Sequence, residues 1–490
     1  MAGVLSSGMI GRVRKPLRTG ALLLLCPVLS GCIIGTERPE LNLEVPTNYR
    51  AAPKSNADAA VPVLDWWRGF RSSEMSALMD AAQIYNLDIA VAIAQIVQAD
   101  AQVGVSGAPL LPTLTGDGSA ERQKNSSATS SLGSGNGFGG PTFNTFTASL
   151  TASYMVDFWG KNRATLYAAE ENATVARYNR EVVTLTTIVT VADSYFQVLA
   201  AQDEIRVTKR NLEAADRILN LIKKQFNGGT ASQLDVSQQE ALAATQRAAI
   251  PPLEVTVGQN IAALALLVGR AAPNFTIHGG SLKQIAVPRV TPGLPSEMLY
   301  QRPDVREAEA QLAASNFSVE SARAAFFPQI QLTGTGGSQS AALANLFTPG
   351  SWFYTLTASL AQPIFDGFLL ESQLKQAKGV QLQNLQAYRK AVLSAFADVE
   401  KALIALQKFT LQERLQEQVV AASQQAFDVA EKQLNGGTIN LITVLQAEQT
   451  LFNAQNQLVI VRLNKLLAAT SLFQALGGGW TPGGTLAAVE

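Results

Sequence analysis

Gln362-Pro-Ile-Phe-Asp-Gly367 opens the stretch that decides the fold, and the chain contains this stretch twice. After it the sequence runs to Leu434 with no proline and one glycine, and then reaches Gly436-Gly437-Thr438. An earlier copy runs from Asp157-Phe-Trp-Gly160, again without proline, to Gly228-Gly229-Thr230. Gly160 and Gly367 are 207 positions apart, and Gly228 and Gly436 are 208 apart. A spacing held this closely indicates an internal duplication.

Larger apolar residues recur in these runs at steps of three and four, which is the spacing of a narrow stripe on one side of a helix. In the second copy they are Leu385, Tyr388, Val392, Phe396, Val399, Leu403 and Leu406. An uninterrupted helix of this kind would be roughly 100 Å long at about 1.5 Å per residue. The other sides carry Gln, Ala, Ser, Glu and Lys, which argues against a membrane span. Each copy is therefore predicted to be a long helical hairpin with Gly-Gly at its tip.

The N-terminus has the features of a secretory signal peptide. Basic residues precede Ala21-Leu-Leu-Leu-Leu25, an apolar run too short to span a bilayer. Leu29-Ser30-Gly31-Cys32 resembles the bacterial lipobox, in which the cysteine is acylated and becomes the new N-terminus. Ile33 follows in place of an inner-membrane retention aspartate, so we expect an outer-membrane lipoprotein carrying palmitate at Cys32. One acylated group is a weak tether, so a second membrane attachment is expected.

Three segments switch from the helical period to a period of two. Apolar residues alternate strictly with Thr and Ser in 146–154 and 354–360, and 329–333 gives a shorter example. Such strands have one dry and one wet face, as in a membrane barrel with a polar lumen. Two hairpins give four strands per chain, too few to close around water, and open edges are not tolerated in lipid. Several copies must share one barrel, and a dimer, trimer or tetramer remains possible on this argument.

Composition offers little material for catalysis. The chain has 47% hydrophobic and 16% charged residues, a formal net charge of +0, one histidine and two cysteines. A neutral chain gives no reason to expect nucleic acid. We expect no enzyme activity, no metal site and no cofactor. His278 is expected at the surface, Asp398 and Glu400 on different helix faces, and Arg302 and Arg306 in structural salt bridges.

The predicted organisation follows from the duplication. The first repeat is expected to contain a hairpin of strands at about 112–157 and the second one at about 328–365, with long helical hairpins at about 161–268 and 368–476. Pro251-Pro252 should kink or break the returning helix of the first repeat. The complete division is a signal peptide at 1–31, an extended leader at 32–65, repeats at 66–272 and 302–477, a connector at 273–301 and a tail at 478–490.

At this point the chain resembles the TolC-like outer-membrane factor family, within it the NodT-like lipoprotein branch of tripartite RND-type efflux systems. The resemblance rests on the segment Leu294 to Glu309 with its Arg302-Pro-Asp-Val block, on Phe326-Phe-Pro328 and on Gln362 to Gly367. Thr443-Val-Leu-Gln446-Ala and Ala475-Leu-Gly-Gly-Gly-Trp480 extend it over nearly the whole mature chain. The resemblance implies a fold of mixed α and β structure, a homotrimeric duct with a shared 12-stranded β-barrel and a long α-helical coiled-coil barrel in the periplasm.

The resemblance also implies a function and partners. The duct would be a passive exit channel in the outer membrane, opened at its periplasmic tip by an adaptor protein that connects it to an inner-membrane efflux transporter. Residues expected to contact the adaptor are Gly228, Gly229, Thr230, Gly436, Gly437 and Thr438. Residues expected at the constriction are Ile442, Thr443, Gln446 and Gln449, with Asp235 at the position of the first copy that corresponds to Thr443. None of the first four is an aspartate, so a neutral plug is expected in place of an anionic ring.

Two alternatives use the same residues differently. In the first alternative, the chain is the outer-membrane component of a type I-like secretion system for proteins or peptides. In the second, it is a structural coiled-coil lipoprotein that spaces the envelope. The strands separate the second alternative from a duct, because a spacer would fold them as a sheet in the periplasm and would not conduct ions.

Overall fold

The computed structural model describes residues 63–124, 142–288 and 299–480, together with residues 43, 46, 49 and 50. The predicted signal peptide, Cys32 and the Ser- and Gly-rich segment within 125–141 lie outside the described residues. The described residues fall into two compact units. One contains the sheet, in 105–167 and 317–377, and the other contains most of the helical residues, in 63–104, 168–316 and 378–480.

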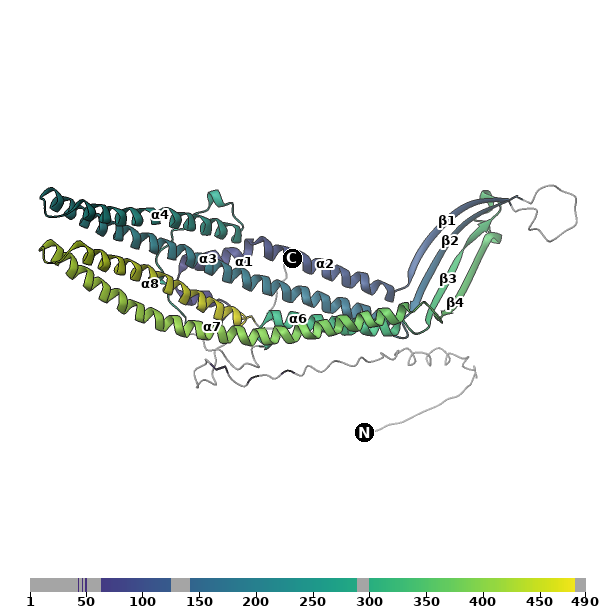
Figure 1. The fold of residues 1–490 in the computed structure, drawn as a ribbon. Helices are drawn as coiled ribbons and strands as arrows, with labels where there is room; N and C mark the ends of the chain where they lie inside the picture. Colours follow the sequence, from purple (N-terminus) through teal and green to yellow (C-terminus); the bar gives the residue numbers. More distant parts are fainter. Residues whose placement is uncertain are drawn as a thin grey trace, which may run out of the picture. The chain divides into compact units, whose positions relative to one another are not determined.

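The element order repeats itself, as Figure 1 shows. The first repeat has α1 (Ser73–Tyr85), α2 (Leu87–Gly107), β1 (Thr113–Lys124), β2 (Thr142–Val156), α3 (Lys161–Asn227) and α4 (Gln233–Leu267). The second has α6 (Pro303–Ala324), β3 (Gln329–Ser340), β4 (Trp352–Ala361), α7 (Leu369–Asn435) and α8 (Leu441–Ala475). Short 3-10 helices are η2 (Trp66–Phe70), η3 (Ala108–Leu110), η4 (Ala272–Asn274), η5 (Leu282–Gln284), η6 (Leu343–Asn345) and η7 (Pro349–Ser351).

The long helices have the same lengths in both repeats. Helices α3 and α7 each have 67 residues, and α4 and α8 each have 35. The prediction at Pro251-Pro252 was a kink or a break. The break is wrong, because α4 is continuous through both prolines, and the kink stays a prediction. Proline cannot donate to the carbonyl four residues earlier, which leaves the carbonyls of Arg247 and Ala248 without a helical donor. Both of these residues are exposed, so water can reach this side of the helix.

The four strands form one antiparallel sheet in the order β1-β2-β3-β4. Strand β2 pairs with β3, with Val156 opposite Ile330, so this pair joins the hairpin of the first repeat to the hairpin of the second. Strands β1 and β4 stand at the edges and have no further partner among the described residues. Gly334, Gly336 and Gly337 lie inside β3 and not in a loop after a strand.

The two faces of the sheet differ sharply in chemistry. The apolar side of β4 carries Trp352, Tyr354, Leu356 and Leu360, which are 63–79% exposed. Residues paired across the strands share a face, and those paired with this side of β4 are mostly Gly, Ala, Leu and Ile. On the opposite face Thr151 and Thr335 hydrogen-bond at 3.2 Å, and Gln331 donates to Ser153 at 2.9 Å. One face is therefore suited to lipid and the other to water.

The main core of the helical unit gathers aromatic and methionine side chains from η2 and α1 onto α3 and α8. Trp66 stacks on Phe473 with ring centroids 4.6 Å apart, and Phe70 lies 5.4 Å from Phe196. Of the predicted connector, residues 273–288 pack on this core, because Leu282 is buried in it and the Ala286 amide donates to the Phe70 carbonyl. Carboxyl groups on α1 and α3 hold the same connector through its backbone amides.

In the part of the chain that the structure describes, four helical segments contain an 18-residue stretch that could cross a membrane by length and composition alone: Ser73–Leu110, α3, α4 and α8. In α3 and α8 about half of this stretch is buried inside the fold, at 50% and 56%. In Ser73–Leu110 and α4 the buried share is 11%. Apolar side chains such as Val97 and Leu266 therefore face outward from the single chain, where another copy or lipid would cover them. That these helices do not cross the membrane stays a prediction.

Two glycines hold equivalent close approaches in the two repeats. Gly269 follows α4 with φ +65°, and a Cβ there would lie 2.2 Å from the Tyr85 carbonyl oxygen. Gly477 follows α8 with φ +82°, and a Cβ there would lie 2.1 Å from the Gln301 carbonyl oxygen. Each long hairpin thus ends against the chain just before α2 or α6, at a position that only glycine fits.

Replacing Gly477 with alanine should destabilise the protein. The left-handed backbone alone costs an alanine about 1–2 kcal/mol, and the contact with Gln301 adds to this. The control is Gly258→Ala in α4, where no atom lies within 4 Å of the added Cβ, and it should leave stability unchanged or slightly raised. Thermal unfolding of both purified variants measures the difference, and equal stability would contradict the assigned contact.

Candidate functional site

The tips of the two hairpins have the same hydrogen-bonded turn. At the first, the Thr230 amide donates to the Gln225 carbonyl at 2.9 Å, and the Gly229 amide donates to the Phe226 carbonyl. At the second, the Thr438 amide donates to the Gln433 carbonyl at 2.9 Å, and the hydroxyl does so as well at 3.1 Å. This is the Schellman arrangement that closes a helix C-terminus.

The two glycines of each tip have different roles. Gly229 and Gly437 have φ values of +74° and +69°, so they provide the left-handed residue of the turn. Gly228 and Gly436 have ordinary backbone conformations, and an added Cβ would come no closer than 3.6 Å to any atom. A side chain at the first glycine would therefore project from the tip without straining it.

The first turns of α8 present two distinct faces. Leu441, Val444 and Leu451 are buried, at 4% exposure or less. The four predicted constriction residues of α8 are all exposed. They are Ile442, Thr443, Gln446 and Gln449. Ile442, with 53% exposure, is a large apolar side chain facing away from the fold, as a residue at a shared axis would.

Two of the predicted constriction residues also have local roles at helix starts. Asp235 forms a capping box with Ser232, whose amide and hydroxyl both donate to the carboxylate at 2.8 Å. Thr443 donates both its amide and its hydroxyl to the Asn440 side chain. Because the Asp235 carboxylate is occupied by its own helix start, the structure gives it a capping function. Its contribution to a constriction stays a prediction.

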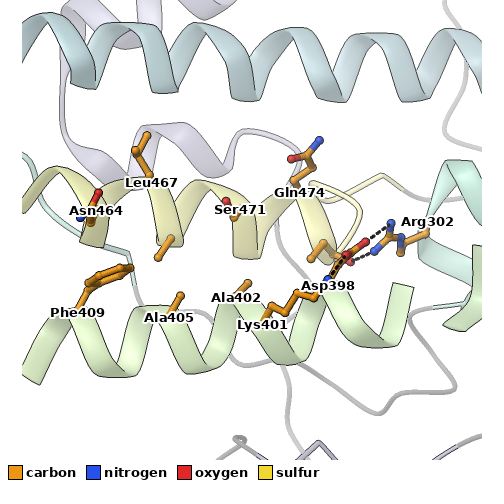
Figure 2. A pocket seen from close by; sticks show the side chains of 12 residues that line it. Arg302, Asp398, Lys401, Ala402, Ala405, Phe409, Asn464, Leu467, Ser471 and Gln474 are labelled. Carbon is orange, nitrogen blue, oxygen red and sulfur yellow. Dashed lines mark hydrogen bonds and ion pairs between the residues drawn. The ribbon is translucent and has the colours of Figure 1, made fainter. Parts of the chain in front are cut away.

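As a clamp, Arg302 holds together the end of the second hairpin that lies away from its tip. Its guanidinium binds Asp304 at 2.7 and 3.0 Å, reaches Asp398 on α7 at 3.4 Å, and donates to the Ala475 carbonyl at the end of α8. Figure 2 shows Arg302 and Asp398 at one end of a groove between α7 and α8, and the volume of this groove is about 560 Å³. The expected structural salt bridge is confirmed for Arg302.

The first repeat makes the same clamp with an uncharged side chain. Asn86 donates to the Leu267 carbonyl at 2.9 Å and accepts hydrogen bonds from the amides of Asp88 and Ile89. Leu267 precedes Ala475 by 208 positions, so both clamps hold the same carbonyl of the returning helix. The contacts of Arg302 therefore give the Arg302-Pro-Asp block a structural function, which is to hold the end of the returning helix.

Other polar candidates are also engaged structurally. The His278 side chain is fully exposed, and its backbone amide donates to Glu74 at 2.6 Å. Arg306 pairs with Glu309, and the Glu400 carboxylate accepts from the Arg50 amide at 3.1 Å. Within the described residues no group of three or more His, Cys, Asp or Glu side chains is arranged to hold a metal ion.

One polar pair was not predicted from the sequence. Gln239 on α4 and Glu448 on α8 are both 0% exposed, and the Gln239 amide nitrogen donates to Glu448 Oε2 at 3.2 Å. Burial raises the pKa of the Glu448 carboxyl to about 7. The pair lies in an apolar cluster that all four long helices build near their tips, with Ile218, Val236, Phe427 and Val444 among its members.

Comparison with known proteins identifies the architecture. The family model described as outer membrane efflux protein matches residues 78–270 and 294–478, one segment for each repeat. This chain belongs to the outer membrane efflux protein family. It is 35% identical over 460 residues to the pyoverdine export outer membrane protein OpmQ of Pseudomonas aeruginosa, covering 94% of this chain and 96% of that protein.

Further relatives of this family extend the match. The probable outer membrane lipoprotein SilC of Salmonella typhimurium is 30% identical, with 92% of this chain and 97% of SilC covered. The crystal structure of the Neisseria gonorrhoeae outer membrane channel MtrE in its open state superposes with a TM-score of 0.80 at 27% identity, over 92% of this chain and 99% of MtrE. The predicted fold class, a mixed α and β duct with an internal duplication, is confirmed, and the chain is an outer membrane efflux channel protein.

Changing Ile442 to glycine together with Gln446 to alanine should raise single-channel conductance in planar bilayers. Both side chains are exposed at the start of α8, and their removal would widen a ring built from equivalent residues of several copies. The matched control removes the corresponding first-repeat side chains, Leu234→Gly with Gln238→Ala. If the variant with Ile442→Gly and Gln446→Ala conducts no more than the unchanged protein, these two residues do not form the constriction.

Proposed function

We propose that this protein is the passive exit duct of a tripartite efflux pump, a homotrimer whose strands share one 12-stranded barrel. The observation that carries the proposal is the open sheet with one apolar and one hydroxyl-rich face. An edge strand in hydrocarbon leaves backbone N–H and C=O groups without partners, at several kcal/mol per group by order of magnitude. Pairing of β4 of one copy with β1 of the next removes both edges of every copy.

Strand length and number fit such a barrel. The strands have 12, 15, 12 and 10 residues, and a tilted membrane strand needs about 9–11. Three copies give twelve strands, enough to surround a water-filled lumen, whereas eight strands leave an interior filled by side chains. The outward apolar surfaces of α2 and α4 would then be covered by the neighbouring copies.

The tips are the surfaces proposed for the periplasmic adaptor. Each tip exposes a glycine without steric crowding, in Gly228 and Gly436, so the end of each hairpin is slim. An adaptor bound there links the duct to an inner-membrane transporter, which supplies the energy, and this chain itself carries out no catalysis. The similarity to OpmQ, a pyoverdine export protein, favours efflux of small compounds over secretion of proteins.

Cys32 is proposed as the lipid anchor in the outer membrane. The name of SilC, an outer membrane lipoprotein, supports this proposal, as does the lipobox that precedes the cysteine. The helical hairpins would then extend into the periplasm from a barrel held by lipid on its apolar face.

Replacing Gly436 with tryptophan should abolish adaptor-dependent resistance while the trimer still assembles. The added Cβ meets no atom closer than 3.6 Å, so the turn can form and the indole would obstruct a partner. Resistance of cells producing the variant, with the oligomer followed on semi-native gels, measures both effects. Loss of the oligomer itself would show that the position is structural, and normal resistance would exclude the tip as the contact.

Replacing Cys32 with alanine should remove the acyl group. Metabolic labelling with palmitate reports this directly, and Cys26→Ala is the matched control because Cys26 lies in the segment removed with the signal. Labelling of the Cys32→Ala protein at the level of the control would disprove the anchor.

A further inference from the structure

The pair Gln239–Glu448 is the one place where side chains with unused hydrogen-bonding atoms are completely buried between the two long hairpins, within the residues described. Gln239 Nε2 donates both to Glu448 Oε2 at 3.2 Å and to the Ala215 carbonyl on α3 at 3.1 Å. It therefore connects α3 and α4 of the first hairpin to α8 of the second. An apolar cluster surrounds this connection and excludes water from it.

Two oxygen atoms of the pair have no hydrogen-bond partner among the described residues. They are Gln239 Oε1 and Glu448 Oε1, one on each side chain. An amide oxygen and an ionised carboxylate oxygen both accept and neither donates, so the two atoms cannot satisfy each other. A proton on Glu448 Oε1 would change this, because the acid would then be able to donate to Gln239 Oε1 while the amide donates to Oε2. The neutral acid and the amide would form a two-point pair.

The charged groups that act on Glu448 are balanced against each other. Burial is the main cause of its raised pKa. The hydrogen bond from Gln239 lowers the pKa, Glu431 on α7 raises it and Arg217 on α3 lowers it. Arg217 and Glu431 pair with one another at 3.8 Å, and Arg217 is 60% exposed. Helix α4 contributes the neutral amide of Gln239. No counter-ion therefore lies against the carboxylate from the described part of any of these helices.

We propose that Gln239 and Glu448 form a proton-dependent latch between the hairpins: the protonated acid holds the two tips together, and loss of its proton to water releases them. The proposal rests on the proposed function, since separation of the hairpins near their tips is taken to open the duct. Glu448 lies about 10 Å along α8 from Leu441, at about 1.5 Å per residue, and the exposed residues Ile442 and Gln446 share these turns. A shift of α8 relative to α4 would therefore move the constriction directly.

The latch has a defined pH window. With a pKa of about 7, the protonated fraction of Glu448 falls from about 97% at pH 5.5 to about 3% at pH 8.5. The pKa in the folded protein is above the ordinary 4.5, so the neutral pair stabilises the fold fully below pH 4.5. This contribution is lost as pH rises from 4.5 to 7 and stays absent above that.

Planar-bilayer conductance of the full-length protein between pH 5.5 and 8.5 tests the latch. The unchanged protein should become more conductive as pH rises, with a midpoint near 7. Glu448→Gln keeps a hydrogen-bond donor toward Gln239 at every pH, so its conductance should stay low over the whole pH range. Gln239→Leu removes the partner and should be conductive throughout. The matched control is Glu240→Gln, which changes the first-repeat counterpart of Glu448, a residue paired with Lys223 at 2.7 Å and half exposed. It should behave as the unchanged protein does.

Two results separate the latch from the proposed function. If Ile442→Gly with Gln446→Ala conducts at all pH values, while the unchanged protein and Glu448→Gln share one pH profile, the duct stands and the latch is overturned. If nothing conducts, the duct fails, and thermal unfolding decides the latch. The stability of the unchanged protein relative to Glu448→Gln should fall between pH 4.5 and 7 and then level off. A difference that does not change with pH overturns the latch.

Discussion

The backbone hydrogen bonds at the two edges of the four-stranded sheet are the constraint on which the rest of the structure depends. Strands β1 and β4 form the two edges of the sheet. On its apolar face Trp352, Tyr354 and Leu356 are exposed, as expected of residues that face lipid. In hydrocarbon no water is available to bind the open edges. The chain therefore has to supply part of a larger closed wall.

The duplication builds this wall with two nearly equivalent arms. Both arms have helices of 67 and 35 residues, the same tip turn, and the same glycine at the far end of the returning helix. The arms differ in two places. Asn86 in the clamp of one arm is replaced by the charged Arg302 in the clamp of the other, and a buried Glu448 in α8 faces an amide on α4. Each clamp acts within its own arm, whereas the Gln239–Glu448 pair connects the two arms.

The sequence was sufficient for the parts of the fold that depend on periodicity. The alternation in β2 and β4 and the apolar stripe of α7 are strong because each residue along the element faces one fixed environment. The pattern of strand β1 is weaker, because the face that carries Leu114 also carries two glycines and the charged Arg122 and Lys124. The double proline was misread, because an exposed helix side lets water take the place of the missing donors.

The site could be predicted only in part from the sequence. The sequence predicts the tip glycines. It does not predict their different roles, because these depend on the backbone angle φ at each position. Asp235 was interpreted by analogy with a constriction, whereas its capping box with Ser232 was a readable local pattern. Glu448 was missed because a glutamate in a polar run suggests a solvated face. The available signal was its position four residues after Val444 and three before Leu451, on the buried stripe.

The mass of the intact protein, extracted from the outer membrane in detergent and measured by native mass spectrometry, tests the central claim most directly. A sheet with two unpaired edges per chain predicts a particle of three copies that loses no subunit while its barrel remains folded. A single copy of the chain, folded and stable after extraction, would contradict the account, because its β1 and β4 edges would then need no partner.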